Sequence, residues 1–155
     1  MGIACAGKTT LARHLRACST LNVVDMDDEI GRFNGGTWPD IARKNNVVLP
    51  KVLAHVCDME NLVLFGSLPV ERTRQLRQAG FHTAVLDVSE AELRRRHAVR
   101  FAEEGWTNVE WFEHEQSVIR DLRVHDVFDQ MIDGERPIAL VADDIMRLVE
   151  DLRHS

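Results

Sequence analysis

Residues 2–9 of this 155-residue chain read Gly-Ile-Ala-Cys-Ala-Gly-Lys-Thr. The segment is a complete GxxxxGK[ST] pattern, and an amphipathic stretch follows it at once. Glycines let the main chain wrap closely around phosphate oxygens, while the amides and the positive end of the following helix attract anions. The spacing brings the lysine to the β- and γ-phosphates of a nucleotide and the threonine hydroxyl to Mg²⁺. We therefore predict a phosphate-binding loop made by Gly2, Cys5, Ala6, Gly7, Lys8, Thr9 and Thr10, with Thr9 as a metal ligand.

The rest of the chain alternates between short apolar runs and longer amphipathic segments. The runs at 21–25, 61–65 and 82–88, and a weaker one at 130–133, are typical of buried parallel strands. The segments 9–18, 38–45, 50–59, 69–79, 89–103, 109–123 and 138–153 are expected to be helical, with Thr37 capping the second. The alternation predicts a doubly wound α/β sheet, and without repeats or linkers the chain reads as a single domain, 1–155.

The sequence before the phosphate-binding loop is unusual. Such a loop should follow a buried strand, yet Met1 is the one residue that precedes Gly2. A central strand pairs with neighbours on both sides, so its loss leaves their backbone groups without partners. We expect that an N-terminal segment with this strand is missing and that the chain as given is less stable for it.

Asp25 is the last residue of the run at 21–25, and a second aspartate, Asp27, follows two positions later. Residues two apart in an extended segment lie on the same side, and the carboxyl ends of parallel strands face the ligand crevice. One carboxylate could serve magnesium while the other orients or deprotonates an acceptor hydroxyl. The alternative is an acidic, solvated start of a helix.

Arginines follow the third run. Arg96 and Arg100 are four residues apart on an expected helix, so they share a face. They could stabilise the charge of a transferring phosphoryl group, or they could pair with nearby glutamates on a solvated surface. The helix begins with Ser89 and Glu92 at capping-box spacing. We expect the three tryptophans to pack in the protein interior, and the alternative is that they line an acceptor pocket: Trp38, Trp106 and Trp111.

Composition excludes several classes of protein. A net charge of -6 argues against broad binding to nucleic acid or anionic membranes. No apolar stretch approaches the ~18 residues of a membrane span, and no signal-peptide pattern is present, so we expect a cytoplasmic protein. The three cysteines lack metal-ligand or disulfide spacing.

Taken together, these motifs resemble the P-loop kinases of small metabolites and nucleotides, which include shikimate, gluconate and adenylate kinases. Asp25-Met26-Asp27 is similar to the DxD of shikimate and gluconate kinases, where the first aspartate serves magnesium and the second the acceptor. Residues 86–96 resemble the strand and helix that lead into the lid, which places Arg96 and Arg100 on lid-flanking arginines and the lid near 96–112. Residues 134–137 fall on the adenine-binding loop, which implies nucleotide contacts from Arg136 and Pro137.

The resemblance implies a three-layer fold with strand order 2-3-1-4-5, in which the central strand is the missing one. The sequence also departs from the pattern of shikimate kinase. The glycine triplet of that family is reduced to Phe65-Gly66-Ser67, and the arginine that binds the substrate carboxylate in that family is not evident, with Lys51 as the nearest candidate for its role. We therefore expect an ATP- and Mg²⁺-dependent kinase with an open choice of small-molecule acceptor. Its catalytic residues would be Lys8, Asp27, Arg96 and Arg100, with Thr9 and Asp25 at the metal. The alternatives are a nucleotide-binding module without transfer activity and a simple NTPase.

Overall fold

The computed structural model describes residues 1–2, 5–105 and 109–154. Its strands are β1 (Asn22–Asp25), β2 (Leu62–Phe65), β3 (Ala84–Asp87) and β4 (Gln130–Asp133). Its helices are α1 (Lys8–Cys18), α2 (Met26–Phe33), α3 (Ile41–Arg43), α4 (Leu49–Cys57), α5 (Val70–Gln78), α6 (Glu90–Glu104), α7 (Val109–Val124) and α8 (Ile138–Arg153), with a π-helical turn η1 (Lys44–Val48). Every strand lies within a predicted run, which confirms the α/β alternation. None of the helices in the described ranges is long and apolar enough to cross a membrane.

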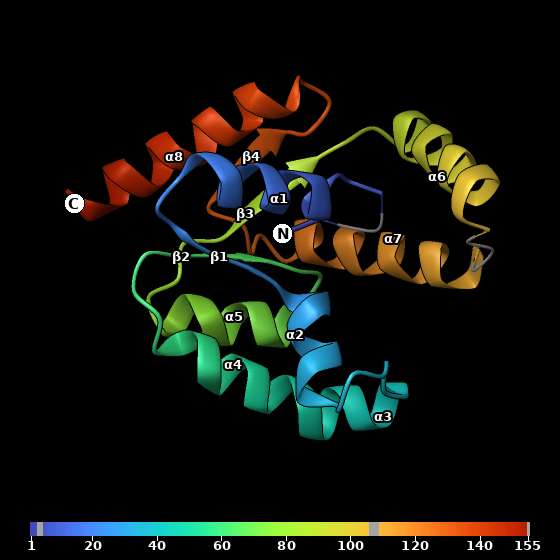
Figure 1. Ribbon diagram of the computed structural model, residues 1–155, viewed down its shortest axis with the longest axis horizontal. Helices are drawn as coiled ribbons and strands as arrows, with labels where there is room; N and C mark the ends of the chain where they lie inside the picture. Colours follow the sequence, from blue (N-terminus) through green and yellow to red (C-terminus); the bar gives the residue numbers. More distant parts are fainter. Residues whose placement is uncertain (3–4, 106–108, 155) are drawn as a thin grey trace.

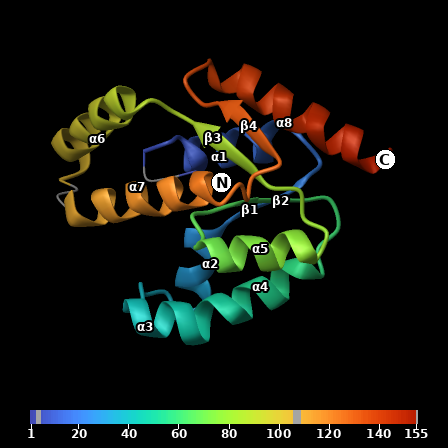
Figure 2. The same cartoon turned by 180° about the vertical axis from the view of Figure 1, so that it is seen from behind.

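The strands form two parallel pairs in the middle of the molecule. β1 pairs with β2 from Asn22↔Leu62 to Asp25↔Phe65, and β3 pairs with β4 from Ala84↔Gln130 to Asp87↔Asp133. Helices α1 and α8 pack together on one side of the strands, while α5 and α7 lie on the other (Figures 1 and 2). Because all pairs are parallel, the carboxyl ends of the strands meet at one edge, where ligands bind in folds of this kind.

The first two residues lie between the pairs, where a central strand would run. The amino group of Met1 donates to the carbonyl of Ala84, and the Leu86 amide donates to the Met1 carbonyl at 2.8 Å. On the other side, the Gly2 amide donates to the Gly66 carbonyl at 3.3 Å. The strand order is thus β1-β2, a gap bridged at its carboxyl end, and β3-β4. This order of the four described strands agrees with the predicted sheet order.

A cleft of about 380 Å³ separates the two strand pairs. Its walls are mostly apolar and come from both pairs and from α8, including Leu62 and Leu64 of β2, Leu86 of β3 and Ile145 of α8. The amino group of Met1 is buried here, and this burial, with the charge of Lys8, lowers the pKa of the group to about 5. The cleft is therefore a poor environment for a charge and a suitable one for an extended apolar segment.

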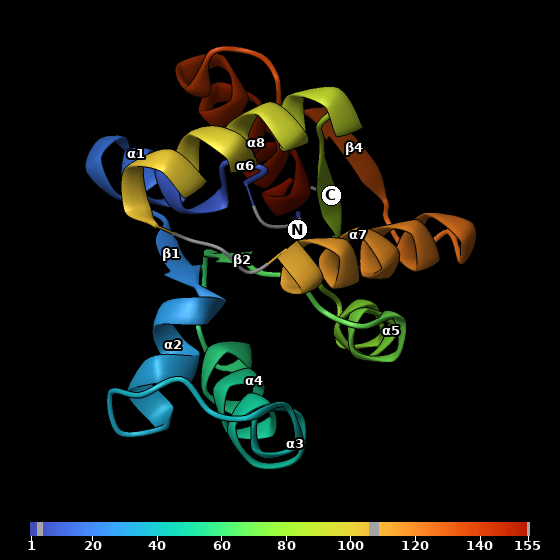
Figure 3. The same cartoon turned by 90° about the vertical axis from the view of Figure 1, so that its right-hand side faces the viewer.

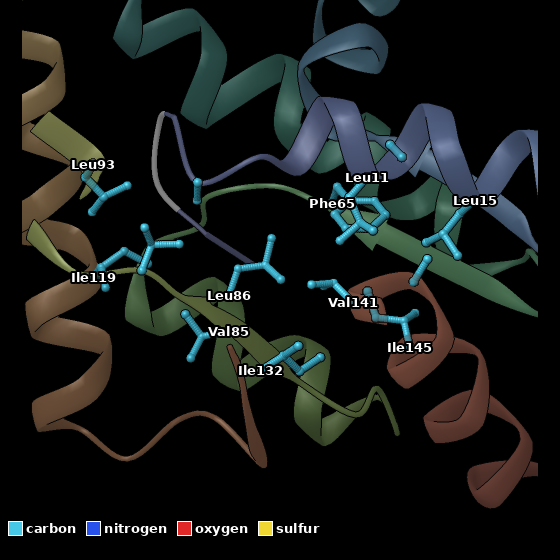
Figure 4. Packing of buried hydrophobic residues seen from close by; sticks show 14 of the residues in the cluster. Leu11, Leu15, Phe65, Val85, Leu86, Leu93, Ile119, Ile132, Val141 and Ile145 are labelled. Carbon is cyan, nitrogen blue, oxygen red and sulfur yellow. The ribbon is translucent and has the colours of Figure 1, made fainter. Parts of the chain in front are cut away.

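The main core holds α1 and α8 against the strands. Leu11 and Leu15 of α1 pack with Phe65 at the end of β2 and with Val141 and Ile145 of α8 (Figure 4). This packing fixes the direction of α1 and with it the direction of the loop at its N-terminus.

A second core lies under α2 and α4, which form a separate lobe in Figure 3. Met26 and Ile30 of α2 pack against Val52 and Val56 of α4, all of them buried. This lobe therefore carries α2 and the turn before α4 on a rigid base beside the strand ends.

The predicted helix 38–45 is wrong. Asp40, not Thr37, is the N-cap and accepts a bond from the Arg43 amide at 2.8 Å, so α3 starts later. After this short helix the chain widens into η1, where the Leu49 amide bonds to the Lys44 carbonyl five residues back. Pro50 follows in the first turn of α4 and has no N–H for an ordinary helical bond. The widened turn is thus placed where the α-helical pattern would be interrupted.

The predicted extended geometry of Asp25 and Asp27 is also wrong. Asp25 is the last residue of β1 and the N-cap of α2, which begins at Met26. Its carboxylate accepts a bond from the Asp27 amide at 3.1 Å, so Asp27 lies in the first helical turn. The two aspartates are brought together by helix capping and not by strand alternation.

Candidate functional site

The phosphate-binding loop turns directly into α1. Gly7 precedes the helix with φ at 96°, a left-handed conformation that suits glycine, and Cys5 has φ at 63°. A side chain at Gly2 would come within 3.2 Å of the Ala6 Cβ, so glycine also allows the close approach of the two ends of the loop. Residues 3–4 lie outside the described residues. Lys8 opens α1 with a side chain that is 9% exposed, at the positive end of the helix.

Thr9 and Asp25 meet beside this loop. The Thr9 hydroxyl donates to Asp25 Oδ2 at 3.0 Å, and Asp25 is only 2% exposed. The same carboxylate caps α2, so its position is fixed from two sides. A hydroxyl and a carboxylate oxygen therefore converge where α1 begins and β1 ends, and oxygen ligands of this kind suit Mg²⁺.

This pair fits magnesium better than a metal held by protein alone. Among the residues that the structure describes, no group of three or more His, Cys, Asp or Glu side chains could hold a metal ion. Mg²⁺ in phosphoryl-transfer sites commonly takes one or two protein ligands together with substrate phosphates and water. Thr9 and Asp25 are sufficient for that arrangement.

Asp27 lies one turn into α2, next to this pair. Solvent reaches its side chain, but protein crowds the carboxylate on its other sides, and this partial loss of solvent raises its pKa. The positive charges of Lys8 and Lys44 act in the opposite direction, and the negative charge of Asp25 acts with the desolvation. A carboxylate with a raised pKa and two lysines nearby is a suitable partner for a hydroxyl group.

Arg96 reaches from α6 to the loop. Its guanidinium donates to the Ala6 carbonyl at 3.3 Å and to the Gly134 carbonyl at 3.1 Å, and Glu92 accepts from its Nε at 2.7 Å. Hydrogen bonds from Arg95 and Arg96 lower the pKa of Glu92 to about 2. Arg96 therefore joins α6 to the phosphate-binding loop.

Arg100 is exposed one turn further along α6. Its catalytic role stays a prediction. The centre of the predicted lid, 106–108, and with it Trp106, lies outside the described residues, as does the side chain of Trp111.

The 134–137 loop lies against the start of α6. The Gly134 amide donates to the Asp87 carbonyl at 2.8 Å, and a Cβ at Gly134 would come within 2.7 Å of Val88. Glu135 accepts a bond from the Ser89 amide at 2.7 Å. Half of the predicted capping box is thus wrong: Ser89 accepts from the Glu92 amide at 3.3 Å, but Glu135, not Glu92, receives the Ser89 amide.

Arg136 and Pro137 have structural roles in this loop. Arg136 pairs with Asp144 of α8 at 2.5 Å and donates to the Leu140 carbonyl, while Pro137 is the N-cap residue of α8. Both residues follow Gly134, which accepts a bond from Arg96. The loop lies next to α6, and the contact of these two residues with a nucleotide stays a prediction.

Lys44 is absent from the predicted site, and Trp38 was given an acceptor pocket only as an alternative to packing. In the structure the charge of Lys44 acts on Asp27, and its ammonium lies over the Trp38 ring. The sequence signal that could have found them is a lysine and a tryptophan within one helical segment after the DxD motif. That signal is weak without knowledge of the turn that brings both residues back toward α2.

No protein-family model and no curated protein matches this sequence. Among solved structures, the fold is similar to a gluconokinase from Sinorhizobium meliloti 1021, with 18% identity and a TM-score of 0.68 over 99% of this chain and 93% of that one. It is also similar to shikimate kinase from Acinetobacter baumannii in complex with shikimate, with 24% identity and a TM-score of 0.66 over 97% and 90% of the two chains. Shikimate kinase from Aquifex aeolicus vf5 matches at 20% identity with a TM-score of 0.63, over 97% of this chain and 94% of that one. These similarities confirm the predicted fold.

Proposed function

We propose that this chain, which has the fold of the P-loop small-molecule kinases, transfers the γ-phosphoryl group of ATP to a small hydroxyl compound in a Mg²⁺-dependent reaction. The observation that carries the proposal is the 3.0 Å bond between the Thr9 hydroxyl and Asp25 at the start of α1. This pair stands beside a phosphate-binding loop and next to a further carboxylate. Supporting it, the similar solved structures named above are kinases of hydroxyl acids.

The nucleotide phosphates would be held by the loop and by Lys8. The amides at the N-terminus of α1 and the buried lysine supply positive charge where phosphate oxygens gather. Thr9 and Asp25 would hold Mg²⁺, which neutralises charge on the β- and γ-phosphates during transfer. Arg96, already in contact with the loop, adds a guanidinium close to the same phosphates.

The acceptor would be oriented by Asp27. This carboxylate lies in the first turn of α2, two residues after Asp25, so a hydroxyl hydrogen-bonded to it would lie close to the proposed metal ligands. Its raised pKa favours acceptance of a proton as the hydroxyl attacks the phosphorus atom. Positioning and charge stabilisation, rather than covalent chemistry, account for the rate in such reactions.

The test is ADP release from Mg-ATP with pools of sugar acids, nucleosides, nucleotides and shikimate, beside a reaction without acceptor. We expect one pool to stimulate release. Equal release with and without acceptor would identify an NTPase, and binding of ATP without release would identify a nucleotide-binding module. Either result would refute the proposal.

A matched pair of variants tests the metal ligands. Thr9→Val removes the hydroxyl with little change of shape and should lower kcat at least ~10²-fold, since one transition-state contact of this kind commonly contributes that much. Thr20→Val makes the same change at an exposed position after α1 and should leave kcat unchanged.

A further inference from the structure

The apolar cleft between β2 and β3 takes no part in the function proposed above. Exposed residues line its mouth near the amino ends of the two strands, among them Cys57, Gly80 and Leu152. Among the residues that the structure describes, no Asp, Glu, Lys or Arg lines the cleft. The cleft is therefore open to solvent at its mouth, and its charge matches that of an uncharged, apolar occupant.

The wall that β2 forms carries main-chain groups that need hydrogen-bond partners. The Asn22 amide of β1 donates to the Asn61 carbonyl, so the odd-numbered residues of β2 turn their main-chain groups toward β1. The even-numbered residues Leu62 and Leu64 then turn theirs toward the cleft. No described residue bonds to the main chain of these two leucines on that side.

The opposite wall, β3, presents an edge of the same kind. The Gln130 amide donates to the Thr83 carbonyl, so the odd-numbered residues face β4, while Ala84 and Leu86 face the cleft. Met1 occupies one end of this edge, because its amine donates to the Ala84 carbonyl and its carbonyl accepts from the Leu86 amide. A residue of a parallel strand makes this pair of bonds to its neighbour. The Ala84 amide, one step further into the cleft, has no partner among the described residues.

Two strand edges that face each other across an apolar gap suit an extended polypeptide. Such a segment has main-chain groups on both sides and can bond to both walls at once. The hydrocarbon chain of a lipid would leave those groups unpaired, at about 1–3 kcal/mol for each buried group. The side chains of the segment would lie between α1 and α8 on one face and α5 and α7 on the other (Figures 1 and 2). Continuous apolar residues suit a strand that is covered on both faces.

We propose that the cleft is a strand-addition site for a separate polypeptide. The partner supplies an uncharged, apolar segment of about five residues, the ordinary length of a strand, rich in β-branched side chains. It binds parallel to β2 and β3 with its carboxyl end toward Met1, and its main chain bonds to Leu62 and Leu64 on one side and to Ala84 on the other. This interaction does not depend on the kinase function proposed above.

The test measures binding of a strand peptide to the whole chain by fluorescence anisotropy. The peptide is acetyl-Lys-Thr-Val-Ile-Val-Val-amide, with a fluorophore on its lysine. Its two controls are N-methylated at alternate residues, one at each set of positions. Successive amides of a strand face opposite sides, so each control loses its donors toward one wall and keeps every side chain. We expect saturable binding of the parent peptide and at least ~10-fold weaker binding of both controls, since two main-chain bonds contribute about that factor.

Hydrogen exchange locates the bound peptide on the protein. The Leu64 and Ala84 amides face the cleft, so the peptide should slow their exchange. The Val63 and Val85 amides already pair with β1 and β4, so their exchange should slow less. This difference between neighbouring amides is the signature of a new strand between β2 and β3.

Three results would overturn the proposal. The first is failure of the parent peptide to bind. The second is equal binding of the parent and the methylated peptides, which would identify a site for apolar molecules without main-chain recognition. The third is a dimer in sedimentation that the peptide does not dissociate, with unchanged exchange at Leu64 and Ala84, because a second copy of the chain would then cover the cleft.

Discussion

Filling the cleft between β2 and β3 should stabilise this protein. We predict that a five-residue apolar, β-branched extension, joined to the amino group of Met1, pairs with both strands and continues the bonds that Met1 already makes to Ala84 and Leu86. Each of the two strands has one described partner strand, so one edge of each faces the cleft. The extension would turn two strand pairs into one continuous parallel sheet.

The magnitude follows from the volume of the cleft. At ~24 cal/mol per Å³, a fully empty space of about 380 Å³ costs roughly 9 kcal/mol, and about half of that if water occupies part of it. About four new main-chain hydrogen bonds add roughly 1 kcal/mol each. Ordering five residues costs roughly 7 kcal/mol. The expected net gain is roughly 1.5–6 kcal/mol, which corresponds to a rise in Tm of roughly 5–20 °C.

The assay is thermal and urea unfolding of three chains: the protein itself, the apolar extension, and an extension of equal length made of Gly, Ser and Pro. Both extensions convert the Met1 amine into an amide. The unmodified amine has a folded-state pKa of about 5 against an ordinary 8.0, so it lowers stability below pH 8 and this cost fades as the pH rises from about 5 to 8. This pH dependence of stability should vanish in both extended chains, because both lack the free Met1 amine. Its loss therefore tests the effect of the amine separately from the effect of strand pairing.

The gain in Tm should belong to the apolar extension alone. Equal melting curves for the two extensions would refute the reasoning, because they would show that the strand edges gain nothing from a new partner.

Other substitutions test separate parts of the site. Gly134→Ala places a Cβ 2.7 Å from Val88 and should lower the free energy of unfolding by roughly 1–3 kcal/mol in urea titrations. Gly31 lies in α2, and a Cβ added there would meet no neighbouring atom within 4 Å, so Gly31→Ala should raise the free energy of unfolding by roughly 0.5–1 kcal/mol. The pKa of Glu92 is about 2 against an ordinary 4.5, so the stabilising effect of this carboxylate is present above pH 4.5 and is lost as the pH falls toward 2. The difference in the free energy of unfolding between the protein and Glu92→Gln should therefore shrink as the pH falls from 4.5 to 2. Lys8→Met should reduce phosphoryl transfer at least ~10²-fold while the circular dichroism spectrum stays unchanged, and full activity in that variant would contradict the role of the loop.

The local parts of this structure could be predicted because short-range physics decides them. The Gly and Lys-Thr spacing predicts a loop that opens a helix, and the apolar runs predict the strands, since burial on both faces requires continuous apolar residues. The errors arose where the fold of a loop decides the local structure. The N-cap of α3 is Asp40 and not the predicted Thr37, because the side chain of Asn34 binds Thr37 and closes the loop before α3.

The contacts between distant segments could not be predicted in this way. That Glu135 rather than Glu92 receives the Ser89 amide depends on where the loop after β4 meets α6, which no local pattern encodes. The same is true of the bond between Thr9 and Asp25, which depends on how α1 packs beside β1.

The sequence alone predicted the fold class and the phosphate-binding loop, because each depends on periodicity or on residues adjacent in the chain. Only the tertiary structure decided that an apolar cleft separates the strand pairs, and that Asp25 both caps α2 and accepts a bond from Thr9. The physical reason is that side-chain contacts between segments depend on how helices pack on the strands. That packing is set by the whole core at once and not by any single stretch of residues.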